Sequence, residues 1–61
     1  MKIKEVIEEG KNALSKNNIE DNVIITRKLL AFVLGVEKQY LVIHLADELN
    51  AEDYIKFKEN I

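Results

Sequence analysis

Few side chains in this sequence could take part in covalent chemistry. The only aliphatic hydroxyls belong to Ser15 and Thr26, the only imidazole belongs to His44, and there is no cysteine. Nucleophilic catalysis needs a nucleophile, a base and an orienting group, and a metal site needs at least two more ligands beside one histidine. We therefore expect Ser15 to be solvated and Thr26 to pack between helices. His44 is expected to be structural or at most a partner contact, pairing with Asp47 or Glu48.

The carboxylates and glycines offer no better site. Adjacent residues of a helix point about 100° apart, so neither Glu8 with Glu9 nor Asp47 with Glu48 forms an acid and base pair. Both pairs are expected on solvated faces. The two glycines stand alone in the sequence, which excludes a glycine-rich phosphate loop. The sequence thus predicts no catalytic, cofactor-binding or metal-binding residue.

Length and charge limit the remaining functions. The 61 residues allow one domain, 48% of them are hydrophobic, and the net charge is −2. The longest apolar stretch, residues 29–36, is short of the roughly 20 residues that a membrane span needs. Lys2 and Lys4 run into acidic residues, unlike the start of a signal peptide. Without cysteine, and with too few clustered cations for nucleic acid, we expect a cytoplasmic domain with a protein partner.

The composition predicts an all-α fold, a small bundle of about four helices. There is no proline, and strong helix formers dominate. The first helix is expected over about 2–16, with Gly10 on its apolar stripe at the close approach of another helix backbone, and Asn17 and Asn18 ending it. The second runs from Asp21 or Asn22, whose side chain would cap it, to Gly35. Its apolar residues cover more than a stripe, so we expect this helix to be central.

Two shorter helices complete the expected bundle. Residues 37–45 would also suit a buried strand, but a lone strand has nothing to pair with, so a helix is predicted. Asn50 is expected to open the last helix in an approximate capping box with Asp53, and Leu49 with Tyr54 fits a hydrophobic staple. Tyr54, Phe57 and Ile61 would form its buried edge. The chain ends on Ile61 inside this predicted helix, which indicates a domain cut from a longer protein.

One spacing is typical of a helix-turn-helix. Ala31, Gly35 and Leu41 stand where a small residue, the turn glycine and an aliphatic residue occur in that motif. Residues 37–44 would then be the reading helix, but Lys38 is its only basic residue, where base and phosphate contacts call for several polar groups. Two antiparallel helices joined through a glycine give the same spacing. DNA binding therefore remains the less favoured alternative.

A spaced pattern of apolar, glycine and charged residues covers nearly the whole chain. It comprises Glu5-Val6-Ile7, Leu14, Ile19-Glu20-Asp21, Arg27-Lys28-Leu29-Leu30-Ala31-Phe32-Val33-Leu34-Gly35, Lys38, Tyr40-Leu41 and Leu49-Asn50-Ala51-Glu52. This pattern resembles the N-terminal domain of HemK-type methyltransferases, also called PrmC. Two departures concern the start of the second helix, where the family commonly has Pro at Asn22 and Asp-Ala at Ile25-Thr26.

The resemblance implies that residues 1–61 are the N-terminal substrate-recognition domain of a larger enzyme. In that family a Rossmann-like domain follows, binds S-adenosylmethionine and carries the motif NPPY, no part of which occurs here. The enzymes methylate the glutamine of the GGQ motif in class I peptide release factors, and the N-terminal domain helps to grip that partner. Lys38 falls where the family often has a basic residue, so the resemblance implies that it contacts the partner.

The expected fragment is a monomer that neither catalyses a reaction nor binds a cofactor, nucleic acid or membrane by itself. One alternative is a freestanding protein interaction module, which could be a dimer with Phe57 and Ile61 at a shared interface. The other is the helix-turn-helix DNA-binding domain described above.

Overall fold

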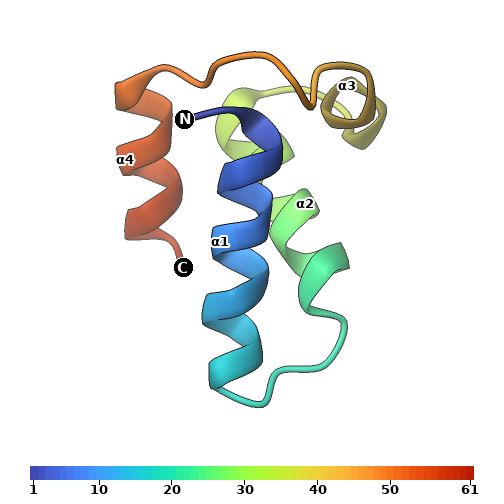
Figure 1. The fold of residues 1–61 in the computed structure, drawn as a ribbon, viewed down its shortest axis with the longest axis vertical. Coiled ribbons are helices and arrows are strands. Elements are labelled where there is room, and N and C mark those ends of the chain that lie inside the picture. Colours follow the sequence, from blue (N-terminus) through green and yellow to red (C-terminus); the bar gives the residue numbers. More distant parts are fainter.

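Four helices form the structure, as the composition predicts (Figure 1). The computed structural model describes residues 1–61, with principal extents of 28 × 21 × 18 Å. Its helices are α1 (Ile3–Lys16), α2 (Asn22–Leu34), α3 (Lys38–Ile43) and α4 (Ala51–Glu59). The α1 and α2 helices run in opposite directions, and α3 lies across the far end of α2. None of the four helices has the length and apolar character needed to cross a membrane.

The α1 helix buries the stripe that its sequence predicts. Its buried residues are Ile3, Val6, Ile7 and Gly10. The helix ends at the C-cap Asn17, and Asn18 follows with φ 58°, a left-handed conformation that asparagine tolerates better than most residues. The predicted bounds of the first helix are therefore confirmed to within a residue.

Backbone carbonyls from the segment between α3 and α4 complete the start of α1. The amide of Ile3 donates to the carbonyl of Asp47 at 2.9 Å, and the amide of Lys4 donates to the carbonyl of Leu45 at 3.0 Å. The amides of a first helical turn have no partner within the helix, so these bonds satisfy two of them. A third bond, from the amide of Leu49 to the carbonyl of Met1 at 2.8 Å, fixes the same segment.

The central position predicted for the second helix is confirmed, because α2 packs against α1, α3 and α4. The predicted cap is wrong. Asp21 has φ 56°, and neither its side chain nor that of Asn22 accepts from the first turn of the helix. Asn22 instead donates its Nδ2 to the carbonyl of Ile19 at 3.5 Å. The helix ends as expected, at Gly35 with φ 68°.

One core joins all four helices. Its buried members are Ile3, Val6, Ile7, Leu30, Ala31, Leu41, Leu49 and Phe57. Thr26 is fully buried beside them, as predicted for a helix-packing residue, and its hydroxyl donates to the carbonyl of Asn22 at 2.6 Å. The other three helices do not cover α2 on every side, however, and they leave Ile24 and Phe32 exposed.

Gly10 is indeed a point of close approach, but its neighbours are side chains and not a helix backbone. An ideal Cβ built on Gly10 would lie 2.6 Å from Cγ2 of Thr26, 2.8 Å from Cζ of Phe57 and 3.1 Å from Cδ1 of Ile61. The absent side chain therefore makes room for residues of α2 and α4 at one point on α1.

The last two helices agree with the sequence except at the end of the chain. Residues 38–43 form a helix, as predicted over the strand alternative. Asn50 caps α4, because its Oδ1 accepts from the amide of Asp53 at 2.8 Å. Leu49 is buried and Tyr54 packs half-buried against the core, the positions that a hydrophobic staple requires. The α4 helix ends at Glu59, so Ile61 follows the helix and does not lie within it as expected.

Candidate partner-binding surface

The side chains of Ser15, Thr26 and His44 lie in different parts of the structure and have different surroundings. Ser15 is exposed near the end of α1, whereas Thr26 is fully buried in α2. His44 follows α3, where its Nδ1 lies 2.6 Å from Oδ2 of Asp47 and its ring stacks on Tyr40 with centroids 4.0 Å apart. This confirms the predicted pairing of His44 with Asp47. The pair stabilises the turn whose carbonyls receive the first amides of α1.

Glu48 and Glu8 each form a pair with a single cation. Glu48 lies 3.2 Å from the N-terminal ammonium, and Glu8 lies 3.7 Å from Nζ of Lys11. Nowhere in residues 1–61 do three histidine or carboxylate side chains gather as a metal site would need. These carboxylates are structural surface pairs.

Glu9 departs from the prediction of a solvated face. It is half-buried, and both of its carboxylate oxygens lie 2.9 Å from the hydroxyl of Tyr54, which donates to them. Nζ of Lys58 donates to the same carboxylate at 2.5 Å. Because the hydrogen bond from Lys58 and that from Tyr54 favour the charged form, they lower the pKa of Glu9. The cluster joins α1 to α4 and has no neighbouring nucleophile to activate.

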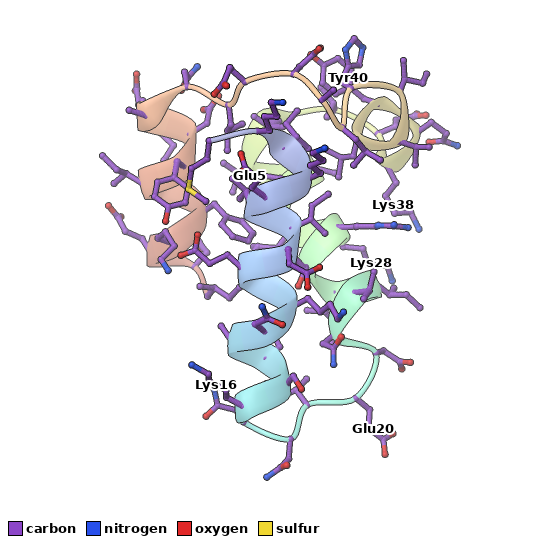
Figure 2. All side chains as sticks on the ribbon, in the orientation of Figure 1. Glu5, Lys16, Glu20, Lys28, Lys38 and Tyr40 are labelled. Carbon is purple, nitrogen blue, oxygen red and sulfur yellow. The ribbon has the colours of Figure 1, made fainter.

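The one residue expected to contact a partner, Lys38, lies exposed at the first position of α3 and forms no ion pair. It lines a surface depression of about 270 Å³ between α2 and α3. The other lining residues are Ile24, Arg27, Gln39 and Val42. We call this depression the α2–α3 groove. Figure 2 shows Lys38 and Lys28 on the same side of the molecule, whereas Lys16 lies at the opposite end of α1.

Arg27 is the groove residue that sequence reasoning did not single out. It is exposed in the middle of α2 and, like Lys38, forms no ion pair. The signal that could have found it is the spacing of Ala31, Gly35 and Leu41. Ala31 and Leu41 are buried and Gly35 makes a left-handed turn, so the two helices cross closely and bring Arg27 to Lys38.

Of the two residues named for the alternative dimer interface, only Ile61 is exposed. Phe57 is fully buried inside the chain, so it has no surface to share with a second copy. The large apolar side chains that are exposed belong chiefly to α2 and α3, among them Ile24, Phe32, Val42 and Ile43. Figure 1 shows that α3 lies on the other side of α1 from α4.

Comparison with known proteins agrees with the resemblance. The model of the PrmC N-terminal domain family matches residues 5–61. A search of curated proteins found no match, and a search of solved structures found none. The family match covers all four helices except the first two residues of α1. On this evidence the chain belongs to the PrmC N-terminal domain family.

Proposed function

We propose that the chain is the N-terminal, substrate-positioning domain of an S-adenosylmethionine-dependent protein-(glutamine-N5) methyltransferase that acts on class I peptide release factors. The observation that carries this proposal is the family match over residues 5–61. The methyl transfer itself and the binding of S-adenosylmethionine would belong to a separate catalytic domain. The cytoplasm, where translation takes place, is the location that we propose for the enzyme.

The role of such a domain is to supply contact area. Holding two reacting groups in the correct geometry removes much of the entropic barrier to their reaction, so a second grip on a large protein substrate favours the productive orientation. The exposed face of α2 and α3 supports this role, because it offers cationic and apolar side chains that the bundle itself does not use. Lys38 is the contact residue that we propose first.

Isothermal titration of the 61-residue chain tests the proposal with two ligands. We expect saturable binding of a purified class I release factor and no heat of binding with S-adenosylmethionine. Saturable binding of the cofactor would assign the chain a catalytic role and contradict the proposal. The absence of any binding to the release factor, measured to protein concentrations near the solubility limit, would contradict it as well.

A further inference from the structure

The α2–α3 groove places two cations beside two aliphatic side chains. Arg27 and Lys38 both line it, and no acidic side chain does. Neither cation forms an ion pair elsewhere in the chain. Two like charges that face one depression repel each other, and a carboxylate placed between them relieves that repulsion. The groove therefore favours an anionic group.

The net charge of residues 22–43, which form α2, α3 and the turn between them, is opposite in sign to the net charge of the whole chain. Residues 22–43 contain three cations, Arg27, Lys28 and Lys38, and one acidic residue, Glu37, while the whole chain has a net charge of −2. The acidic residues are thus concentrated on other parts of the bundle. An acidic partner would be attracted to α2 and α3 and repelled by the remaining surface, which fixes its orientation.

The α2 and α3 helices also expose large apolar side chains, two of which, Ile24 and Val42, line the groove. Phe32 is 80% exposed, Ile43 76%, Val42 58% and Ile24 52%. Ile24, Lys28 and Phe32 follow one another at intervals of four residues, so they lie along one stripe of α2. Apolar side chains gathered on a surface and bordered by charges mark protein interaction sites. The partner must therefore supply apolar contacts together with its charge.

The size of the groove suits a side chain. Its volume of about 270 Å³ is close to the lower end of the range of about 300–1,000 Å³ that is typical of ligand pockets, which is enough for one side chain. Its polar groups, two cations and the amide of Gln39, are those that bind a carboxylate in a short protein segment. Aliphatic side chains on either side of that carboxylate would contact Ile24 and Val42.

We propose that the α2–α3 groove binds a protein segment in which a carboxylate is flanked by aliphatic side chains. Arg27 and Lys38 hold the carboxylate, and Ile24, Val42 and Phe32 pack against the aliphatic groups. The proposal deepens the proposed function and rests on it for the identity of the partner, a class I release factor. The chemistry assigned to the groove does not depend on the proposed function.

A nucleic acid fits the same surface less well. Binding to duplex DNA depends on neutralising many phosphates, and this face offers three cations on a chain of net negative charge. Exposed Phe32, Val42 and Ile43 have no counterpart in a phosphate backbone. The apolar component of the surface thus favours a protein.

Nuclear magnetic resonance of the ¹⁵N-labelled chain tests the proposal. During titration with a class I release factor, the amide signals of residues 24–28, 32 and 38–43 should shift or broaden first. Lys38→Glu and Arg27→Glu should each weaken binding by roughly tenfold, since each replaces an attraction by a repulsion at the same point. Lys38→Glu is well suited to this test because an acidic residue is favourable in the first turn of a helix, so α3 is retained.

Lys16→Glu is the matched control. Lys16 is an exposed, unpaired lysine at the far end of α1, so its reversal changes the net charge equally without touching the groove (Figure 2). It should leave the affinity within about twofold. Equal weakening by Lys16→Glu and Lys38→Glu would show a general charge effect and overturn the proposal.

The remaining outcomes separate this inference from the proposed function. Binding of the release factor to another face would overturn the groove assignment and leave the proposed function standing. If the release factor does not bind, a blocked peptide of repeated Leu-Glu-Glu-Leu units tests the groove by itself. Shifts at residues 24–28 and 38–43 with that peptide would support the groove although the proposed function fails. The absence of shifts with both ligands, or the same shifts with duplex DNA instead, would overturn the inference.

Discussion

The two glycines of the chain are required for different reasons. Gly35 adopts φ 68° after α2, a left-handed conformation in which other residues are strained, although nothing lies within 4 Å of the place that its Cβ would occupy. Gly10 lies inside α1 with helical backbone geometry, and what it provides is space. Gly35 thus sets the direction of the chain between α2 and α3, whereas Gly10 sets how closely α2 and α4 approach α1.

Replacement of Gly10 by alanine should therefore destabilise the domain. Alanine favours a helix by about 1 kcal/mol over glycine, but overpacking of a filled core costs about 1–3 kcal/mol. The new Cβ would lie within 3 Å of Thr26 and Phe57, and neither can move away because both are fully buried. The two terms leave a net loss of up to about 2 kcal/mol in the free energy of unfolding, measured by urea titration.

Two further variants identify the cause of that loss. Asn12→Ala, on the exposed side of the same helix, should raise stability by a few tenths of a kcal/mol through helix propensity alone. Gly10→Ala should cost less in a Phe57→Leu background, since the shorter side chain leaves room for the methyl group. A gain in stability from Gly10→Ala would show that the contacts around Gly10 are loose.

Glu9 gives the stability of the domain a defined dependence on pH. Its ordinary pKa is 4.5, and the hydrogen bonds from Lys58 and Tyr54 lower it in the folded chain. A carboxyl group with a lowered folded pKa contributes stability that is fully present above 4.5 and is lost as the pH falls through the folded value. Urea unfolding followed from neutral to acidic pH should therefore show a falling midpoint below that point.

Glu9→Gln separates this contribution from those of the other carboxylates. The variant should be less stable than the native chain at neutral pH, and the difference should shrink as the pH falls. At the alkaline end the hydrogen bond to Glu9 raises the pKa of Lys58 from 10.5 and that of Tyr54 from 10.0, so the same cluster loses strength as the pH rises through those raised values. A difference between the two chains that stays constant with pH would contradict this assignment.

At the scale of the elements, the start of α1 depends on a segment more than 40 residues away in the sequence. The amides of Ile3 and Lys4 donate to carbonyls of Asp47 and Leu45. The first two amides of α3, those of Lys38 and Gln39, have no such partner. Amide hydrogen exchange should therefore be slower at residues 3 and 4 than at residues 38 and 39, although all four lie in first helical turns.

Equal exchange at the two helix starts would mean that, in solution, the segment between α3 and α4 detaches from the start of α1. A variant that loosens this segment provides the comparison. His44→Ala removes the pair with Asp47, and exchange at residues 3 and 4 should then accelerate while exchange at residues 38 and 39 stays unchanged.

The sequence was sufficient to predict features that depend on neighbours along the chain. The number of helices, the end of α1 at Asn17 and the cap of α4 by Asn50 all follow from local periodicity and turn chemistry. Features that depend on distant residues were missed. Glu9 meets Tyr54, 45 residues later, and no short-range pattern marks that pair. The left-handed backbone of Asp21 was missed as well, although aspartate tolerates that conformation better than most residues, and its side chain does not cap the helix.

At the scale of the whole molecule, folding and partner binding use different residues of the same short helix. In α3, Leu41 is fully buried beneath α2, whereas the next residue, Val42, is 58% exposed in the α2–α3 groove. A domain of this size has at most about 3–5 kcal/mol of stability from its core, so it cannot lose a core side chain and stay folded. It can lose a surface side chain.

We consequently expect Leu41→Ala to impair folding and Val42→Ala to impair partner binding. Leu41→Ala should cost about 2–5 kcal/mol and remove the cooperative thermal transition followed by circular dichroism. Val42→Ala should change the free energy of unfolding by less than about 0.5 kcal/mol, because the side chain is already largely hydrated. It should nevertheless weaken the binding of a class I release factor in the titration described above. If both variants unfold, the exposed part of α3 is needed for folding. If Val42→Ala binds the release factor as tightly as the native chain, the aliphatic wall of the groove does not contact the partner.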